Sequence, residues 1–226
     1  MKTTRALALL AVAADAVLSA IAYHLLPERV PVHWDLSGHV NRYGSKLELV
    51  LIGPLGLAGL WVLMLVLSRI DPRRVERPPP PPDGVPSEAE GSYWTFIHLV
   101  LVALAVLHAG ILLAAAGILK GPERFVAVGL ALLLLLPGNF IGRLRPNWFV
   151  GIRTPWTLAS DDVWRRTHRL AAVLMVCGGL LLLPLSLLLT PAYAVSAAVV
   201  VTLLATLGPA AWSYFAWRRL RRGTAP

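Results

Sequence analysis

Six long apolar stretches alternate with polar segments along the chain. They cover residues 6–26, 47–67, 93–119, 125–141, 170–189 and 192–217. A helix needs roughly 20 mostly apolar residues to cross a bilayer, and such a helix bonds all of its backbone groups within itself. The pattern therefore predicts an all-α, polytopic membrane protein with six transmembrane helices.

The first stretch also has features of a signal peptide, because Lys2 and Arg5 precede its apolar run. That run is as long as a full span and continues through His24 without a clear polar exit. We therefore expect it to remain in the protein as the first membrane helix. A cleaved leader is the alternative.

The composition supports a membrane protein and predicts its orientation. Apolar types make up 57% of the chain and charged types 15%, which is too apolar for the surface of a soluble domain. Sixteen of the 21 Lys and Arg residues lie in the amino terminus, the second and fourth connections and the tail. Since positive residues gather on the cytoplasmic side, both termini are predicted to be cytoplasmic, N-in and C-in. We attribute the net charge of +9 to this asymmetry. We expect the positive residues to interact with the lipid bilayer, and we expect no direct binding of nucleic acid.

A proline-rich segment, RPPPPPDGVPSEAEG at residues 77–91, divides the chain. Its prolines favour an extended backbone, and it has little apolar surface to bury. We predict a two-helix hairpin over residues 1–70, a cytoplasmic linker over 71–92 and a four-helix unit over 93–226. Cys177 is the single cysteine, so an intrachain disulfide is excluded.

Two polar residues fall inside the predicted spans. Asp15 lies about nine residues into the first span, roughly 14 Å deep at 1.5 Å per residue. A charged, unpaired carboxylate there costs about 2.5 kcal/mol or more. His108 can lie at a similar depth, so an Asp15–His108 pair is our hypothesis for a proton or ligand path. The alternative is a neutral Asp15 bonded to nearby backbone.

The first connection, LPERVPVHWDLSGHVNRYGSK, alternates apolar and polar residues from Val30 to Leu36. The pattern predicts a short extended segment with one apolar face, followed by a turn at SGH. His33, Asp35 and His39 are weak candidates for a zinc site, because their spacing has no standard ligand geometry. We favour hydrogen bonds within the connection, or a polar recognition surface in which Trp34 and Tyr43 lie at the membrane interface.

The residues of the fourth connection predict a helix that begins in the cytoplasm at about Asp161 and continues into the fifth span. Ser160 is a good N-cap, and acidic residues suit the first turn of a helix. Asp161 is expected to pair with Arg165, and Asp162 with Arg166, each four residues on. The preceding residues contain Pro146, Gly151 and Pro155, so we expect an irregular segment that lies in the interface or packs among the helices. Such a segment either docks a partner or ligand, or only seals the cytoplasmic end of the bundle with Arg143, Arg145 and Arg153 on lipid phosphates.

Two sets of motifs resemble the SdpI family of bacterial membrane proteins. The first connection carries the LP, PxHW and YxSK pattern of the domain of unknown function found at the front of many members, and residues 138–172 are similar to the family's GN, RPN, GIRTPWTL and VWxxTH pattern. His33 belongs to this pattern, whereas Asp35 and His39 do not clearly belong to it.

The resemblance implies an immunity and signalling protein. Members of this kind would resist a secreted, membrane-active peptide toxin and hold a cytoplasmic transcriptional repressor at the membrane. Our candidates for contact with the toxin or ligand are His33, Trp34, Asp35, His39, Tyr43 and Lys46. Our candidates for coupling or partner binding are Asn139, Arg145, Asn147, Arg153, Thr154, Trp156, Asp161, Trp164, Arg165 and His168.

Two other classes of function stay open. A small-molecule transporter or channel would use Asp15 and the polar fourth connection. A membrane enzyme ranks third, because the sequence has no nucleophile with an adjacent base and no glycine loop for phosphate. We expect no cofactor and no catalytic residues.

Overall fold

The computed structural model describes residues 2–35, 40–75, 88–119 and 122–223. Six long helices account for most of them: α1 Lys2–Leu25, α2 Lys46–Ile70, α4 Glu88–Ala115, α5 Pro122–Ile141, α7 Asp161–Leu188 and α8 Pro191–Gly223. All six are long and apolar enough to cross a membrane. The predicted all-α polytopic architecture is confirmed.

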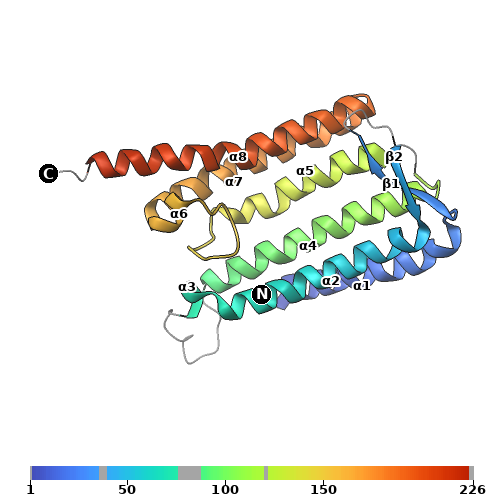
Figure 1. Ribbon diagram of the computed structural model, residues 1–226, viewed down its shortest axis with the longest axis horizontal. Coiled ribbons are helices and arrows are strands. Elements are labelled where there is room, and N and C mark those ends of the chain that lie inside the picture. Colours follow the sequence, from blue (N-terminus) through green and yellow to red (C-terminus); the bar gives the residue numbers. More distant parts are fainter. Residues whose placement is uncertain (1, 36–39, 76–87, 120–121, 224–226) are drawn as a thin grey trace.

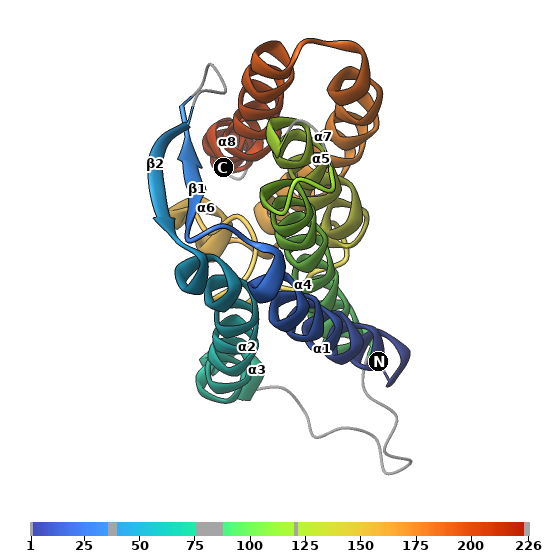
Figure 2. The same cartoon turned by 90° about the vertical axis from the view of Figure 1, so that its right-hand side faces the viewer.

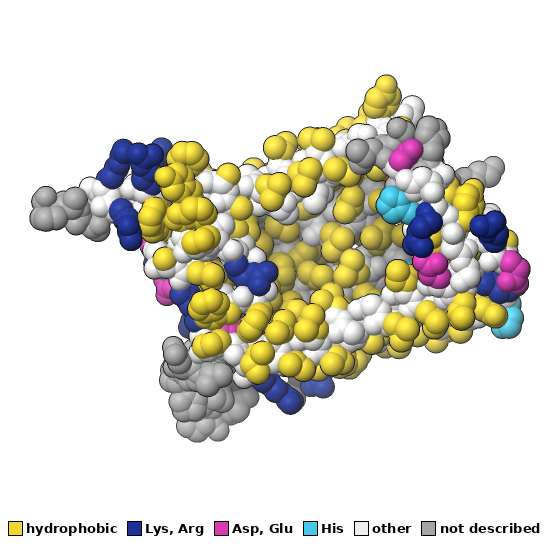
Figure 3. Space-filling model, in the orientation of Figure 1, with side chains coloured by type: hydrophobic (Ala, Val, Ile, Leu, Met, Phe, Trp, Pro, Cys, Tyr) yellow, Lys and Arg dark blue, Asp and Glu magenta, His cyan; other side chains and the backbone are white. Residues whose placement is uncertain are grey.

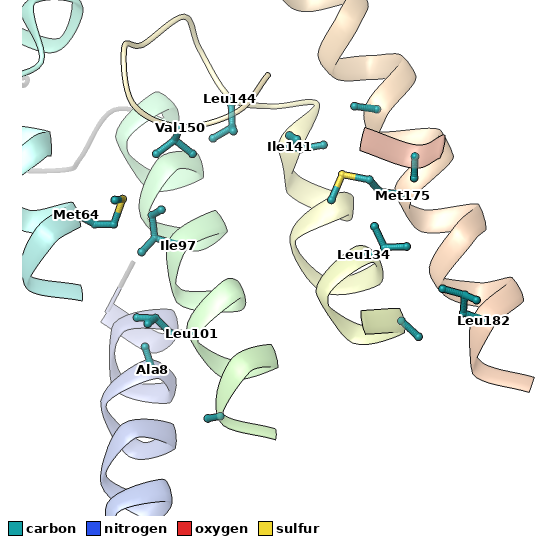
Figure 4. Packing of buried hydrophobic residues seen from close by; sticks show 14 of the residues in the cluster. Ala8, Met64, Ile97, Leu101, Leu134, Ile141, Leu144, Val150, Met175 and Leu182 are labelled. Atoms are coloured by element: carbon teal, nitrogen blue, oxygen red, sulfur yellow. The ribbon is translucent and has the colours of Figure 1, made fainter. Parts of the chain in front are cut away.

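The long helices pack in succession across the bundle. The helices α1 and α2 contact α4, α4 contacts α5, and α5 contacts both α7 and α8; Figure 2 shows this succession nearly end-on. One apolar core runs through all six helices, with Leu101 of α4, Leu134 of α5 and Leu182 of α7 all nearly fully buried (Figure 4). Many other leucines and valines lie on the outside, as expected for helices that face lipid.

Glycines allow the closest approach between helices. A Cβ atom at Gly179 of α7 would lie 2.8 Å from the backbone oxygen of Ala131 in α5. At Gly138 of α5 it would lie 2.7 Å from the Cβ atom of Met175 in α7. Small residues let backbones approach in a membrane, where helix association depends on packing. These glycines therefore fix the spacing of α5 and α7.

A β-hairpin joins α1 to α2 at one end of the bundle. Its strands, β1 Arg29–Trp34 and β2 Val40–Ser45, pair antiparallel. The predicted extended segment is confirmed for β1. Val30 is fully buried and His33 is exposed, as its apolar face predicts, but Pro31 and Val32 are both partly buried. The Trp34 side chain and residues 36–39, with the predicted turn, lie outside the described residues. The pairing is irregular around Pro31, which has no N–H group to donate. The partner strand β2 is an addition to the predicted fold.

Two short helices lie at the opposite end: α3 Pro72–Val75 after α2, and α6 Pro155–Ala159 before α7 (Figure 1). The prolines and glycine before Ser160 predicted no regular helix there, and this prediction was wrong for α6. Pro155 occupies the first turn, where a missing N–H costs nothing, and Thr154 forms a capping box with Thr157. The predicted start of α7 at Asp161, with Ser160 as its N-cap, is confirmed.

Helix α8 ends at the end of the bundle opposite the hairpin, and α1 begins on the side away from the hairpin (Figure 1). Lys and Arg side chains gather at this end, while hydrophobic side chains line the hollowed middle of the face in Figure 3. We call the two ends the hairpin end and the loop end. Their orientation in the membrane stays a prediction.

The single cysteine makes this orientation testable. In a Cys177→Ser background, a cysteine at Tyr43 would lie on the hairpin and one at Arg222 near the end of α8. Both termini are predicted to be cytoplasmic, so a membrane-impermeant thiol reagent on intact cells should label the first variant and label the second only after lysis. Labelling of the Arg222 variant in intact cells would reverse the orientation.

Candidate functional site

A buried histidine joins three helices below the hairpin. His108 Nδ1 of α4 lies 2.8 Å from Asp15 Oδ1 of α1, and His108 Nε2 lies 2.9 Å from the backbone oxygen of Leu49 in α2. His108 is 8% exposed and Asp15 is 3% exposed. The structure therefore contains the pair expected from the two depths in the sequence.

The contacts of this pair determine how many protons it holds. The Leu49 carbonyl can only accept, so His108 Nε2 carries a hydrogen and donates it. A second hydrogen must lie between Nδ1 and the carboxyl oxygen, because two lone pairs would otherwise face each other. The pair is thus imidazolium with carboxylate, or imidazole with carboxylic acid. In both forms its net charge is zero, which suits burial in a membrane.

Gly53 makes room for His108. A Cβ atom at Gly53 would lie 2.1 Å from Nδ1 of the ring. Beside the ring, a cavity of about 400 Å³ opens between α2 and α4, with Gly56 and Leu104 in its wall. A Cβ atom at Gly56 would meet nothing within 4 Å, so the space beside this part of α2 contains no protein atoms.

Two buried oxygens near the pair have no hydrogen-bond partner among the described residues. They are Asp15 Oδ2 and the hydroxyl of Ser19, one helical turn further along α1. Both residues are 3% exposed. Polar atoms without a hydrogen-bond partner are unusual in a protein interior. Asp15 Oδ2 and the Ser19 hydroxyl are therefore available to hydrogen-bond a further polar group.

At the hairpin end, two predicted contact residues are displayed on the surface. His33 donates from Nδ1 to Asn41 Oδ1 at 2.5 Å, which ties β1 to β2 and leaves the residue exposed. Tyr43 is 55% exposed. Asp35 follows β1 and is partly buried. His39 and the side chain of Trp34 lie outside the described residues.

The proposed metal site has no support in the described part of the chain. No group of three His, Cys, Asp or Glu residues there could hold a metal ion. His33 uses a ring nitrogen on Asn41, an amide that belongs to the hairpin itself.

Lys46 closes the base of the hairpin. Its Nζ lies 2.7 Å from Glu28 Oε1 and 4.6 Å from the centre of the Tyr23 ring. The hydroxyl of Ser45 accepts from the N–H of Glu48 and caps α2. The last two residues of the YxSK motif thus start α2 and close the hairpin, so Lys46 is less available to a ligand than its motif implied.

At the loop end, residues 142–160 fold back against the bundle, as expected. We call this segment the return loop. Asn147 shapes its turn, because Asn147 Oδ1 accepts from the N–H groups of Phe149 and Val150, and Nδ2 donates to the carbonyls of Arg145 and Val150. Val150 and Asn147 are 5% and 2% exposed. Asn147 is therefore an internal support of the loop.

His168 fastens the return loop to α7. Its Nε2 accepts from the N–H of Ile152 at 3.0 Å, and its Nδ1 donates to the carbonyl of Trp164 at 2.8 Å. The ring stacks on Trp164, with centroids 4.0 Å apart. Because one ring nitrogen must accept, His168 is neutral in this arrangement. Gly151 has a φ of 102°, and a Cβ atom there would lie 2.4 Å from His168 Nε2.

Asp71 and Arg73 connect α2 to the return loop, and neither was among the residues predicted from the sequence. Asp71 is fully buried and accepts from the N–H of Trp148 at 3.1 Å. Arg73 donates to the carbonyl of Leu158 and lies 3.6 Å from Asp161. The one available signal was an Asp-Pro pair directly after an apolar span, which is typical of a capped helix end.

The predicted ion pairs of α7 are half right. Asp162 pairs with Arg166 at 2.8 Å, as expected. Asp161 does not pair with Arg165, because Asp161 lies beside Arg73 and Arg165 turns to Asp162 at 3.5 Å. The spacing of four residues predicted Arg165 as the partner of Asp161. In the folded chain Arg73, which follows α2, lies closer to Asp161 than Arg165 does.

The remaining candidates divide into buried supports and exposed groups. Trp164 is fully buried and donates to the carbonyl of Leu144. The hydroxyl of Thr154 lies 3.0 Å from that of Ser213 in α8, and Trp156 packs edge-on against Tyr214, so both hold α6 to α8. The exposed candidates are Asn139, Arg145, Arg153, Asp161 and Arg165.

Comparisons with known proteins match both the segment that contains the hairpin and the segment that contains most of the return loop. Residues 143–213 match the model of the SdpI/YfhL protein family, and residues 10–57 match a domain of unknown function (DUF1648). The chain is 26% identical over 204 residues to the immunity protein SdpI of Bacillus subtilis strain 168, which covers 89% of this chain and 90% of that protein. No solved structure matches the chain.

A pair of alanine variants tests the intramembrane contact. Gly53→Ala would force His108 from its two partners, and we expect it to lower stability by about 2 kcal/mol or more. Gly56→Ala adds the same methyl group to the same helix in open space and should change stability by less than about 1 kcal/mol. Thermal unfolding of the purified full chain in detergent measures both. Equal unfolding temperatures for the two variants would contradict the role assigned to Gly53.

Proposed function

We propose that this chain, which belongs to the SdpI/YfhL protein family, is a multi-pass membrane immunity protein that protects its cell from a membrane-active peptide toxin. The observation that carries the proposal is the similarity to an immunity protein along nearly the full length of both chains. The placement of the two signature regions at opposite ends of one bundle supports it, because a toxin and a cellular partner would be met on different sides of the membrane.

The hairpin is the proposed place of toxin contact. The charge asymmetry of the connections predicts that it lies outside the cell. It is held by both α1 and α2, since Val30 is buried in an apolar cluster with Ala22 of α1, Leu49 of α2 and Leu112 of α4. A rigid, supported surface loses little conformational entropy on binding. His33 and Tyr43 are the exposed groups available for contact.

The return loop is the proposed place of contact with a cytoplasmic repressor. Three buried residues, Asn147 of the loop and Trp164 and His168 of α7, hold the loop in one conformation. The exposed side chains of Arg145, Arg153 and Arg165 would then meet the partner. We therefore narrow the proposed partner surface to these arginines and to Trp148, which is 46% exposed.

Transport remains the second candidate, and the contact between Asp15 and His108 is the observation that favours it. A buried pair that shares one proton is suited to a proton-coupled transporter. Asp15→Asn separates the two functions. Transport predicts that this change abolishes uptake or efflux, whereas immunity alone predicts that protection persists at equal protein level.

The immunity proposal is tested by survival. The chain is expressed in a strain killed by the small secreted peptide encoded nearest to its gene, and the toxin dose that halves survival is measured. His33→Ala with Tyr43→Ala should lower that dose about tenfold, the effect of roughly 1.4 kcal/mol of lost contact. The matched control is His24→Ala with Tyr193→Ala, which removes an exposed histidine and tyrosine at the same end of the bundle but outside the hairpin.

The hairpin variant, its control and the unchanged chain must be present in the membrane at equal levels. Unchanged protection by the hairpin variant would rule out the hairpin as the contact surface. Failure of the unchanged chain to protect would overturn the immunity proposal itself for that peptide.

A further inference from the structure

We infer that a cavity at the loop end binds a phosphate-bearing group, the headgroup of an anionic lipid in the membrane. The cavity has a volume of about 360 Å³ and lies where α5 ends and α7 begins. Four arginines line it, Arg143, Arg145, Arg165 and Arg169, together with one carboxylate, that of Asp161. This inference does not depend on the immunity function.

The positive charge of this cavity is not balanced by the protein. Arg73 already lies beside Asp161, and Arg165 is 3.5 Å from Asp162, a carboxylate that does not line the cavity. Arg143, Arg145 and Arg169 have no carboxylate partner within the part of the chain that the structure describes. Like charges that share a cavity repel one another. An anion in the cavity would remove this repulsion.

The arginines are arranged so that several can contact one anion. Arg165 and Arg169 lie one turn apart on α7, and residues four apart share a helix face. Arg143 and Arg145 approach from the return loop, and the guanidinium of Arg143 lies 5.1 Å from the centre of the Phe140 ring, which helps to position it. One guanidinium group can donate two parallel N–H hydrogen bonds to two oxygens of the same phosphate. This geometry favours phosphate over a halide ion.

The depth of the cavity favours a lipid as the source of the phosphate. Leu170 follows Arg169 directly and begins the apolar run of α7, while Ile141 ends the apolar run of α5. The arginines therefore lie at the boundary of the hydrocarbon layer, the level of lipid headgroups. Basic pockets between membrane helices are known to bind anionic headgroups. A lipid here would connect the end of α5 to the start of α7 and brace the return loop.

The test measures binding to the purified full chain in neutral detergent. Phosphatidylglycerol, phosphatidylcholine and inorganic phosphate are titrated separately, with thermal unfolding and native mass spectrometry as readouts. Phosphatidylglycerol should bind and raise the unfolding temperature, whereas phosphatidylcholine should not. Arg143→Gln with Arg169→Gln should weaken phosphatidylglycerol binding at least about tenfold. Arg218→Gln with Arg219→Gln, which removes the same charge from exposed positions on α8, should leave binding unchanged.

Each outcome decides between sources or rejects the site. Binding of inorganic phosphate that is lost in the cavity variant, without any preference among lipids, would keep the phosphate site and replace the lipid with the free ion. Equal loss in both double variants would show general charge attraction and overturn the inference, as would equal binding of the two lipids. Arg143→Lys with Arg169→Lys keeps the charge without the paired donors, so it should recover part of the affinity if the glutamine variant is folded.

Discussion

The return loop depends on hydrogen bonds from its backbone to side chains. Between Trp148 and Thr154, five backbone N–H groups donate to side-chain atoms: those of Trp148, Phe149, Val150, Ile152 and Thr154. A chain that turns back at a membrane end has neither a helix nor a sheet to satisfy these groups, and leaving one buried and unpaired costs about 1–3 kcal/mol. The acceptors therefore determine where the loop can lie, and they come from α7, from the end of α2 and from the loop itself.

This constraint relates the two halves of the chain. Asp71 belongs to the end of α2, yet its carboxylate accepts from the loop before α7. At the other end, His108 of α4 contacts both α1 and α2. The helices α1 and α2 are thus attached to the rest of the bundle by buried polar contacts near both ends, and by apolar packing between them. A change at the hairpin could be transmitted through α2 to the return loop, which is the mechanical requirement for the proposed signalling role.

Features governed by local rules were predictable from the sequence. The six spans follow from apolar length, and the start of α7 follows from Ser160 and the acidic first turn. The contact between Asp15 and His108 could be predicted because a buried carboxylate needs a partner and His108 lies at a similar depth. Asp71, Arg73 and the true partner of Asp161 could not, because their contacts join residues far apart in sequence. The short helix α6 was missed because Pro155 was treated as a helix breaker without regard to its position in the first turn.

The central claim is that His168 determines the structure of the return loop and is not displayed to a partner. Hydrogen–deuterium exchange of the full chain tests it most directly, with His168→Ala compared against Arg166→Ala, which alters an exposed residue less than one turn away on the same helix and outside the arginine cavity. Loss of the Ile152 contact should speed exchange across residues 148–158 at least about tenfold in His168→Ala, while Arg166→Ala should match the unchanged chain. Unaltered protection of this segment in His168→Ala would contradict the account.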